Sequence, residues 1–204
     1  GVKIKVGHAG TLDPLASGVM VVCTGRATKQ IDTLQAGVKE YIATLRLGAT
    51  TPSFDLEHPI DHTYATCHID HQLVETQLKK FIGDIWQTPP AFSAVKVDGK
   101  RAYDLARKGK EVELKPKLLR IDELELLDCA LAGAEKFLTI RVVCSKGTYI
   151  RALARDIGEA LGSGAHLTSL RRTRVGDFRV EDCMQLDDFE GWLAQQTIET
   201  ELPQ

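Results

Sequence analysis

Residues 7–18 read GHAGTLDPLASG, a polar segment that leads directly into the apolar run GVMVVC at residues 18–23. Its three glycines allow a tight chain path and the close approach of another backbone or of a ligand. Pro14 biases the preceding Asp13 towards an extended backbone. The GK[ST] ending of a phosphate-binding loop is absent. From residue chemistry alone this is a constrained loop before a buried strand, and a structural turn and a catalytic carboxylate both fit it.

Strand and helix patterns alternate irregularly along the rest of the chain. Polar and apolar residues alternate at 40–47, which predicts a strand with one covered face. Helical spacing of apolar residues predicts helices at 70–82 and 148–161. We also expect a helix ending near 37, a hairpin around 98–99 and a short helix at 102–108. Strands are expected at 118–131 and 137–144, a strand pair over 166–180, and a helix at 186–195. This mixture favours an α+β fold on a mixed, largely antiparallel sheet flanked by helices, in one domain over residues 1–204.

Composition bounds the class of protein. Hydrophobic residues make up 43% of the 204 residues, as in a globular protein with a sizeable core. No stretch approaches the roughly 20 apolar residues that span a bilayer, and residues 1–10 lack the apolar run of a signal peptide. The five cysteines form no CxxC pair, so neither a disulfide framework nor a zinc ribbon is indicated. We therefore expect a cytoplasmic protein without membrane contact.

Charge is strongly segregated although the formal net charge is only −2. Residues 96–120 carry nine Lys or Arg against four Asp or Glu, and residues 141–179 carry eight against three. Residues 181–204 hold seven acids and no base. Such segregation can create a basic face that binds nucleic acid, although solvated surface charge is the commoner explanation of it.

Four histidines gather in one polar stretch: His58, His62, His68 and His71, with Cys67 between them. Their spacing fits no standard zinc pattern, so we interpret them as solvent-facing side chains and predict no metal site.

Further motifs follow the aspartate loop in a fixed order. They are Lys39-Glu40-Tyr41, PPAFSAVK at 89–96 with GKRAY at 99–103, CSKGTYIR at 144–151, and GAHL at 164–167 with LRR at 170–172. Together with residues 7–18 they closely resemble the signature of the bacterial tRNA pseudouridine synthase B family. The resemblance covers residues 5–178 and implies the pseudouridine synthase catalytic fold. It also implies isomerisation of the T-loop uridine at conventional tRNA position 55, without metal or organic cofactor.

The resemblance implies a role for each matching residue. Asp13 aligns with the family's essential catalytic aspartate, and Arg151 with the arginine that forms a salt bridge to it. An arginine can bind a carboxylate through two parallel hydrogen bonds and stabilise its charged form. Tyr41 matches the active-site tyrosine that stacks on the target base and can relay a proton. Its alternation pattern fits a half-buried strand tyrosine equally well.

The remaining candidates are expected to bind the substrate. Tyr149 and Leu170 correspond to residues that line the uridine pocket, where an apolar wall suits a base removed from its stack. His8 matches a histidine that fills the space left in the T loop when nucleotides flip out. Further side chains are expected to contact phosphates: Arg171, Arg172, Arg174, Lys96, Lys100 and Arg101.

The resemblance also sets expectations about domains and partners. The family normally begins upstream with a further strand and a Lys-Pro-containing loop, and many members end in an RNA-binding domain of the PUA type. We expect this chain to lack both. The expected partner is the T-arm stem-loop of tRNA, bound by a monomer. Two alternatives stay open: a guide-RNA-dependent synthase of the dyskerin type, and a catalytically silent RNA-binding or tRNA-folding module.

Overall fold

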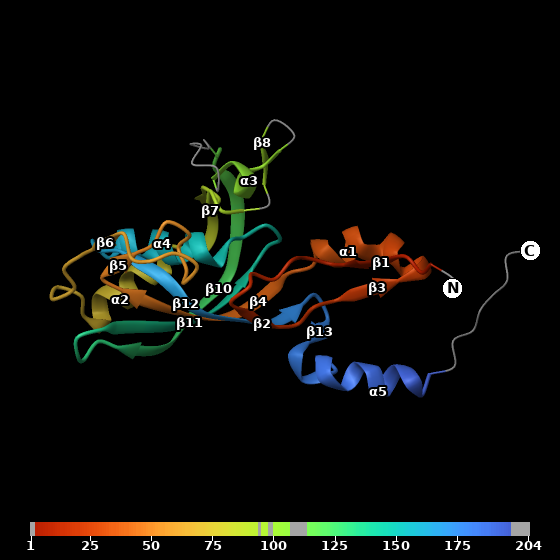
Figure 1. Cartoon of the computed structure of the whole chain (residues 1–204). Coiled ribbons are helices and arrows are strands. Elements are labelled where there is room, and N and C mark those ends of the chain that lie inside the picture. Colours follow the sequence, from red (N-terminus) through yellow and green to blue (C-terminus); the bar gives the residue numbers. More distant parts are fainter. Residues whose placement is uncertain (1–2, 94, 98–99, 107–113, 197–204) are drawn as a thin grey trace, which may run out of the picture.

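The computed structural model describes residues 3–93, 95–97, 100–106 and 114–196 (Figure 1). A seven-stranded sheet forms the body of the molecule. Its strands are β2 (Ala16–Gly18), β4 (Lys39–Leu47), β7 (Gly83–Gln87), β10 (Lys117–Ala130), β11 (Lys136–Cys144), β12 (Ala165–Val175) and β13 (Phe178–Arg179). Their order is β13-β12-β4-β11-β10-β7, and β2 pairs with β12 beside β13. Every pair is antiparallel except β2 with β12, which confirms the predicted α+β class.

Two helices cover one face of this sheet. They are α2 (His71–Lys79), whose first turn is capped by the Asp70 carboxylate, and α4 (Ile150–Ala160). α2 contacts β10 and α4, while α4 contacts β12 and β4. Gly158 lets α4 approach β12 closely, because a Cβ there would lie 2.3 Å from the amide nitrogen of Ala165. The core lies between these helices and the inward-facing residues of the central strands.

Polar side chains cover the other face of the sheet. The hydroxyls of Thr44 and Thr139 lie 3.2 Å apart across β4 and β11, and Arg141 binds Glu40 between the same strands. This division follows from the alternation of side chains along a strand. It separates the helix-covered face, which carries the candidate site, from a half-exposed polar face.

An N-terminal ribbon extends away from the body (Figure 1). It consists of β1 (Val6–His8), β3 (Val22–Thr24), the short η1 helix (Gly25–Gln30) and α1 (Ile31–Ala36). The sequence predicts one buried strand at 18–23, and this prediction is wrong. The run divides between β2 and β3, which belong to different sheets, and the Met20 and Val22 side chains are exposed.

The remaining elements are short. They are β5 (Ala49–Thr50), β6 (His62–Thr63), β8 (Lys96–Val97), β9 (Lys100–Arg101), α3 (Ala102–Ala106), the η2 and η3 helices (Val180–Asp182 and Leu186–Asp188) and α5 (Phe189–Ala194). β8 and β9 pair as the predicted hairpin requires, while its turn at 98–99 lies outside the described residues. Among the residues that the structure describes, no helix is long and apolar enough to cross a membrane.

Candidate active site

The loop between β1 and β2 carries Asp13 and rests on β12. The loop ends in a turn, in which the Ala16 amide donates a hydrogen bond to the Asp13 carbonyl at 2.8 Å. β2 then pairs in parallel with residues 170–172. At Gly18 a Cβ would lie 2.1 Å from the carbonyl oxygen of Arg172, so only glycine allows this close pairing. The glycine-rich sequence therefore docks the aspartate loop against the central sheet.

Arg151 comes from a different part of the chain, the first turn of α4. The helix starts after a turn at 145–148, in which the Thr148 hydroxyl donates to the Ser145 carbonyl at 2.9 Å. One face of α4 packs into the core, and Arg151 itself is only 5% exposed. A buried guanidinium needs several partners to offset the loss of water.

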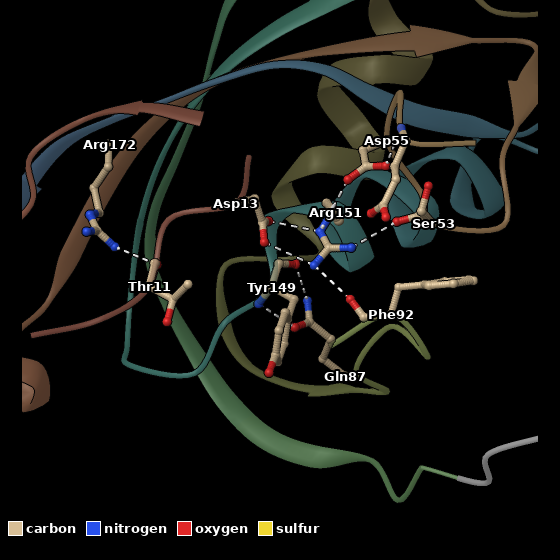
Figure 2. Close-up of polar contacts among 10 residues, drawn as sticks. Thr11, Asp13, Ser53, Asp55, Gln87, Phe92, Tyr149, Arg151 and Arg172 are labelled. Carbon is tan, nitrogen blue, oxygen red and sulfur yellow. Dashed lines mark hydrogen bonds and ion pairs between the residues drawn. The ribbon is translucent and has the colours of Figure 1, made fainter. Parts of the chain in front are cut away.

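Asp13 and Arg151 meet in a two-pronged ion pair (Figure 2). The Arg151 Nε donates to Asp13 Oδ2 at 2.9 Å, and Nη2 donates to Oδ1 at 3.1 Å. This fork geometry fixes the carboxylate plane as well as its position. The Asp13 side chain is still 30% exposed, so one side of the carboxylate remains open to a ligand. The structure thus brings together the two residues that the sequence predicts as a pair.

The Arg151 guanidinium also fastens two other loops to the site. It donates to the carbonyl oxygens of Ser53 at 3.2 Å and Phe92 at 3.1 Å. Ser53 precedes Phe54, which has a φ of 62°. A positive φ is uncommon for a bulky residue, and such conformations gather at functional sites.

Asp55 is a second carboxylate beside Arg151 that was not predicted from the sequence. Its Oδ2 lies 3.7 Å from the Arg151 Nε, and its side chain is 5% exposed. The amide of Glu57 donates to its Oδ1 at 2.9 Å, and the Thr51 hydroxyl donates to its carbonyl at 2.6 Å. The residue lies in a polar stretch without periodicity, so nothing in the local pattern distinguishes it from a solvated loop acid.

Tyr41 and Leu170 both lie on the helix-covered face, where Tyr41 pairs with Arg172 and Leu170 pairs with Ala43. They belong to β4 and β12, and Tyr41 packs against the buried cluster that includes Leu170. Burial raises the pKa of the Tyr41 phenol; the charge of Asp13 acts in the same direction, and the charge of Arg172 opposes both. The phenol therefore stays protonated at neutral pH and is a hydrogen-bond donor there.

Tyr149 caps the start of α4 and is clamped by Gln87. The Gln87 amide donates to the Tyr149 carbonyl at 3.2 Å, and the Tyr149 amide donates to Gln87 Oε1 at 2.9 Å. Gln87 is 1% exposed, and it was not predicted as a site residue from the sequence. Burial raises the pKa of the Tyr149 phenol as well. The clamp fixes the backbone two residues before Arg151.

The structure separates the neighbouring arginines of β12. Arg171 is exposed and points to the polar face, whereas Arg172 lies on the helix-covered face and is 1% exposed. The Arg172 guanidinium donates to carbonyls of the aspartate loop. The prediction that Arg172 contacts phosphate is therefore corrected, because its donors are buried and face backbone oxygens.

Two other substrate-binding candidates lie on the short strands β1 and β8. His8 is exposed on the N-terminal ribbon, at the end of β1. Lys96 lies in β8, but its side chain falls outside the described part of the chain.

The four histidines have separate surroundings. His58 packs against Phe92 with ring centroids 4.5 Å apart, and His62 packs against Tyr64 at 5.0 Å. His68 Nε2 bonds to the Leu161 carbonyl at 2.8 Å. Within the described ranges, no group of three or more His, Cys, Asp or Glu residues is arranged to hold a metal ion.

Two family models match the chain end to end. One is described as TruB family pseudouridylate synthase (N terminal domain) and covers residues 1–150. The other, tRNA pseudouridylate synthase B C-terminal domain, covers residues 151–204. The two ranges meet in the first turn of α4, and the seven-stranded sheet takes strands from both.

Curated relatives match over nearly the whole chain. A protein of Bacteroides thetaiotaomicron named tRNA pseudouridine synthase B is 68% identical over 199 residues, which is 98% of this chain and 83% of that protein. A protein of the same name from Phocaeicola vulgatus is 70% identical and covers 97% of this chain and 82% of its own length.

Solved structures share the fold at lower identity. A chain in the crystal structure of a Cbf5-Nop10-Gar1 complex superposes with a TM-score of 0.68 at 32% identity, covering 93% of this chain and 46% of that one. A chain in the structure of an H/ACA RNP bound to a substrate RNA containing 2'-deoxyuridine gives 0.64 at 28% identity, covering 96% and 48%.

Proposed function

Because the chain belongs to the TruB family of pseudouridylate synthases, we propose that it isomerises a uridine of tRNA to pseudouridine. The observation that carries the proposal is the half-open Asp13 carboxylate, held from behind by the buried Arg151. Pseudouridine has the same atoms as uridine, so the reaction consumes neither a group donor nor a redox equivalent.

Asp13 is the catalytic residue of this proposal. The reaction breaks the N1–C1′ bond, rotates the base and rejoins it to C1′ through C5. C5 then loses its proton and N1 gains one, so the atoms balance. A positioned carboxylate can add to the base, attack C1′, or remove a sugar proton to form a glycal. Each route needs a carboxylate fixed in direction, and the Arg151 fork fixes it. The exposed side of Asp13 is where the sugar or the base would approach.

Three side chains form the proposed uridine pocket: Tyr41, Tyr149 and Leu170. Aromatic and apolar walls suit a base that has left its stack, at a cost of a few kcal/mol for the flip. Tyr41 offers a ring face and, because it stays protonated, a hydrogen bond to the base. His8, exposed at the end of β1, would fill the space that the flipped nucleotides leave in the RNA.

The target proposed here is the T-loop uridine at conventional position 55, in the T arm of tRNA. The close relatives named tRNA pseudouridine synthase B support a tRNA substrate. We further propose a monomer that acts in the cytoplasm, as the motif resemblance implies.

The likeness to H/ACA complexes keeps a guide-dependent synthase as the second candidate. Those chains are 28–32% identical and the present chain covers less than half of each, whereas the named tRNA enzymes are 68–70% identical. The higher sequence identity to the named tRNA enzymes favours a stand-alone tRNA enzyme.

A single modification assay distinguishes the stand-alone tRNA enzyme from a guide-dependent synthase and from a catalytically silent RNA-binding module. The protein is incubated with an unmodified tRNA transcript, with the isolated T-arm stem-loop, and with a transcript whose target uridine is replaced by cytidine. Pseudouridine is then mapped by chemical sequencing. We expect modification of the T-loop uridine in the first two RNAs without guide RNA, and none in the third. Binding without product would favour a silent RNA-binding module, and product only with a guide RNA would favour the second candidate.

A further inference from the structure

We infer that Arg172 does not bind RNA and is instead a positioning residue. It fixes the Asp13 loop to β12, the strand that pairs with β4, where Tyr41 lies. This inference rests on the proposed function and adds a residue that acts on the reaction through Asp13. It starts from the unexpected burial of Arg172, which is 1% exposed and is among the largest fully buried side chains.

The guanidinium of Arg172 joins the two limbs of the loop. Its Nε donates to the Val19 carbonyl at 2.8 Å, after Asp13 in the chain. Its Nη1 and Nη2 donate to the carbonyls of Thr11 and Gly10, each at 3.2 Å, before Asp13. Three carbonyls from both sides of a turn are thus bound by one planar group (Figure 2 shows the contact to Thr11).

The backbone of Arg172 binds the same loop. Its carbonyl accepts the Val19 amide at 2.9 Å, and residues 170–172 pair with β2. On its other side Arg172 pairs with Tyr41 across β12 and β4. One residue therefore couples the position of the catalytic carboxylate to the strand that carries the proposed base-stacking tyrosine.

A lysine cannot replace this arrangement. Arginine presents donors in a rigid fork, whereas a lysine ammonium is a single point charge on a flexible stem. A lysine at 172 would bind one limb of the loop and release the other. Small displacements of a reacting group cost up to about 100-fold in rate, so the catalytic step should be sensitive to the exchange.

Arg171 provides a matched comparison. It precedes Arg172, carries the same charge and is exposed on the opposite face of the strand. A phosphate-binding arginine acts on affinity and on its salt dependence, and a positioning arginine acts on the chemical step. The two substitutions should therefore change different measured quantities.

The test compares Arg172→Lys and Arg172→Met with Arg171→Met in the full chain. Three quantities are measured: the single-turnover rate at saturating enzyme, the tRNA Kd at two salt concentrations, and amide hydrogen exchange. For both Arg172 variants we expect a rate lower by about 10- to 100-fold, a Kd within about threefold of the parent, and an unchanged salt slope. Exchange should become faster in residues 8–20 and stay the same in β4 and β11. Arg171→Met should weaken binding, reduce the salt slope by about 1, and leave exchange in residues 8–20 unchanged.

Two results would overturn the inference. One is an Arg172→Lys variant with the parental single-turnover rate and parental amide exchange in residues 8–20. The other is an Arg172→Lys variant whose tRNA affinity and salt slope fall as those of Arg171→Met do. If circular dichroism shows that Arg172→Met is unfolded, the test relies on the Arg172→Lys variant. In that folded variant, amide hydrogen exchange in residues 8–20 shows whether Arg172 holds the loop. A parent protein that forms no pseudouridine would refute the proposed function itself, and the exchange measurement would still report whether Arg172 holds the loop.

Discussion

Arg151 binds two carboxylates and two loop carbonyls while almost wholly buried. A buried cation with one acidic partner would be neutralised by it, but a second acid leaves the group of three with a net negative charge. Asp55 therefore shares the Arg151 guanidinium with Asp13, whose side chain remains partly open to solvent. Residue by residue, the candidate site consists of a partly exposed carboxylate, a buried cation and a second, buried carboxylate.

We predict that Asp55→Asn slows the reaction without weakening RNA binding. The amide keeps the shape of the side chain but removes the charge near the Arg151 Nε, so the guanidinium shifts towards Asp13. We expect a single-turnover rate lower by about 10- to 100-fold, with a tRNA Kd within about threefold of the parent. Asp61→Asn is the matched control, because Asp61 is exposed in the same loop and bonds to Thr50. Equal rates for both variants would contradict the role given to Asp55.

Sequence motifs predict the residues that act through local context and miss those that act through distant contacts. Asp13 and Arg151 stand in recognisable segments, and the structure joins them. Asp55 and Gln87 act only because loops far apart in the chain meet at α4. Arg172 was found but given the wrong partner, since the sequence does not show how deeply that position is buried.

At the level of elements, Glu40 ties β4 to both of its neighbours. The Thr173 hydroxyl of β12 donates to its Oε1 at 2.7 Å, and Arg141 of β11 donates to its Oε2 at 2.7 and 3.1 Å. Burial alone would raise the pKa of Glu40, but these hydrogen bonds and the nearby arginine charges outweigh it and lower the pKa below 4.5. The ionised form therefore stabilises the fold next to Tyr41.

We predict that Glu40→Gln lowers the free energy of unfolding by about 2 kcal/mol at pH 7, as expected for hydrogen bonds to a charged group. The Glu40 pKa is lower in the folded state than in the unfolded state, so its contribution is complete above pH 4.5. That contribution is lost as the pH falls through the folded value. Urea unfolding at pH 7 and below pH 4 measures the difference, with Glu159→Gln on the exposed side of α4 as control. A difference between parent and Glu40→Gln that grows with acidity would contradict this assignment.

Helices and strands were predicted correctly where a regular hydrophobic pattern extends over a long segment. The pattern at 40–47 became β4, that at 70–82 became α2 (His71–Lys79), and that at 148–161 became α4 (Ile150–Ala160). The prediction failed at 18–23, where a positive φ at Gly18 ends β2 and the chain turns towards a second sheet. β7 (Gly83–Gln87) was not predicted, and it lies at the edge of the sheet beside β10.

Over the whole molecule, charge is segregated along the sequence. The net charge is −2, yet exposed cations lie on elements that also carry site residues: Lys146 in the turn before α4, and Arg171 on the polar face of β12. Phosphate contacts position RNA without reading its sequence. The fold is likewise a property of the whole chain, because β12, from the range of the second family model, pairs with β2 and β4 from the first.

We predict that the double variant Lys146→Gln, Arg171→Gln binds tRNA more weakly and with less salt dependence. Each lost phosphate contact should reduce the slope of log affinity against log salt by about 1. Fluorescence anisotropy with labelled tRNA between 50 and 200 mM salt, roughly the range over which such effects are large, gives the slope. The control is Lys79→Gln, Lys80→Gln, which removes two exposed charges at the end of α2. Equal slopes for parent and test variant would exclude phosphate contacts at both positions.

The central claim is that the carboxylate of Asp13, held by Arg151, carries out the isomerisation. The most direct measurement is the single-turnover rate of pseudouridine formation in tRNA by Asp13→Asn, beside the parent and an Asp32→Asn control on the exposed surface of α1. We predict a rate lower by at least about 1,000-fold for Asp13→Asn, with tRNA still bound, and a parental rate for the control. Pseudouridine formed by Asp13→Asn at a rate near that of the parent would contradict the claim.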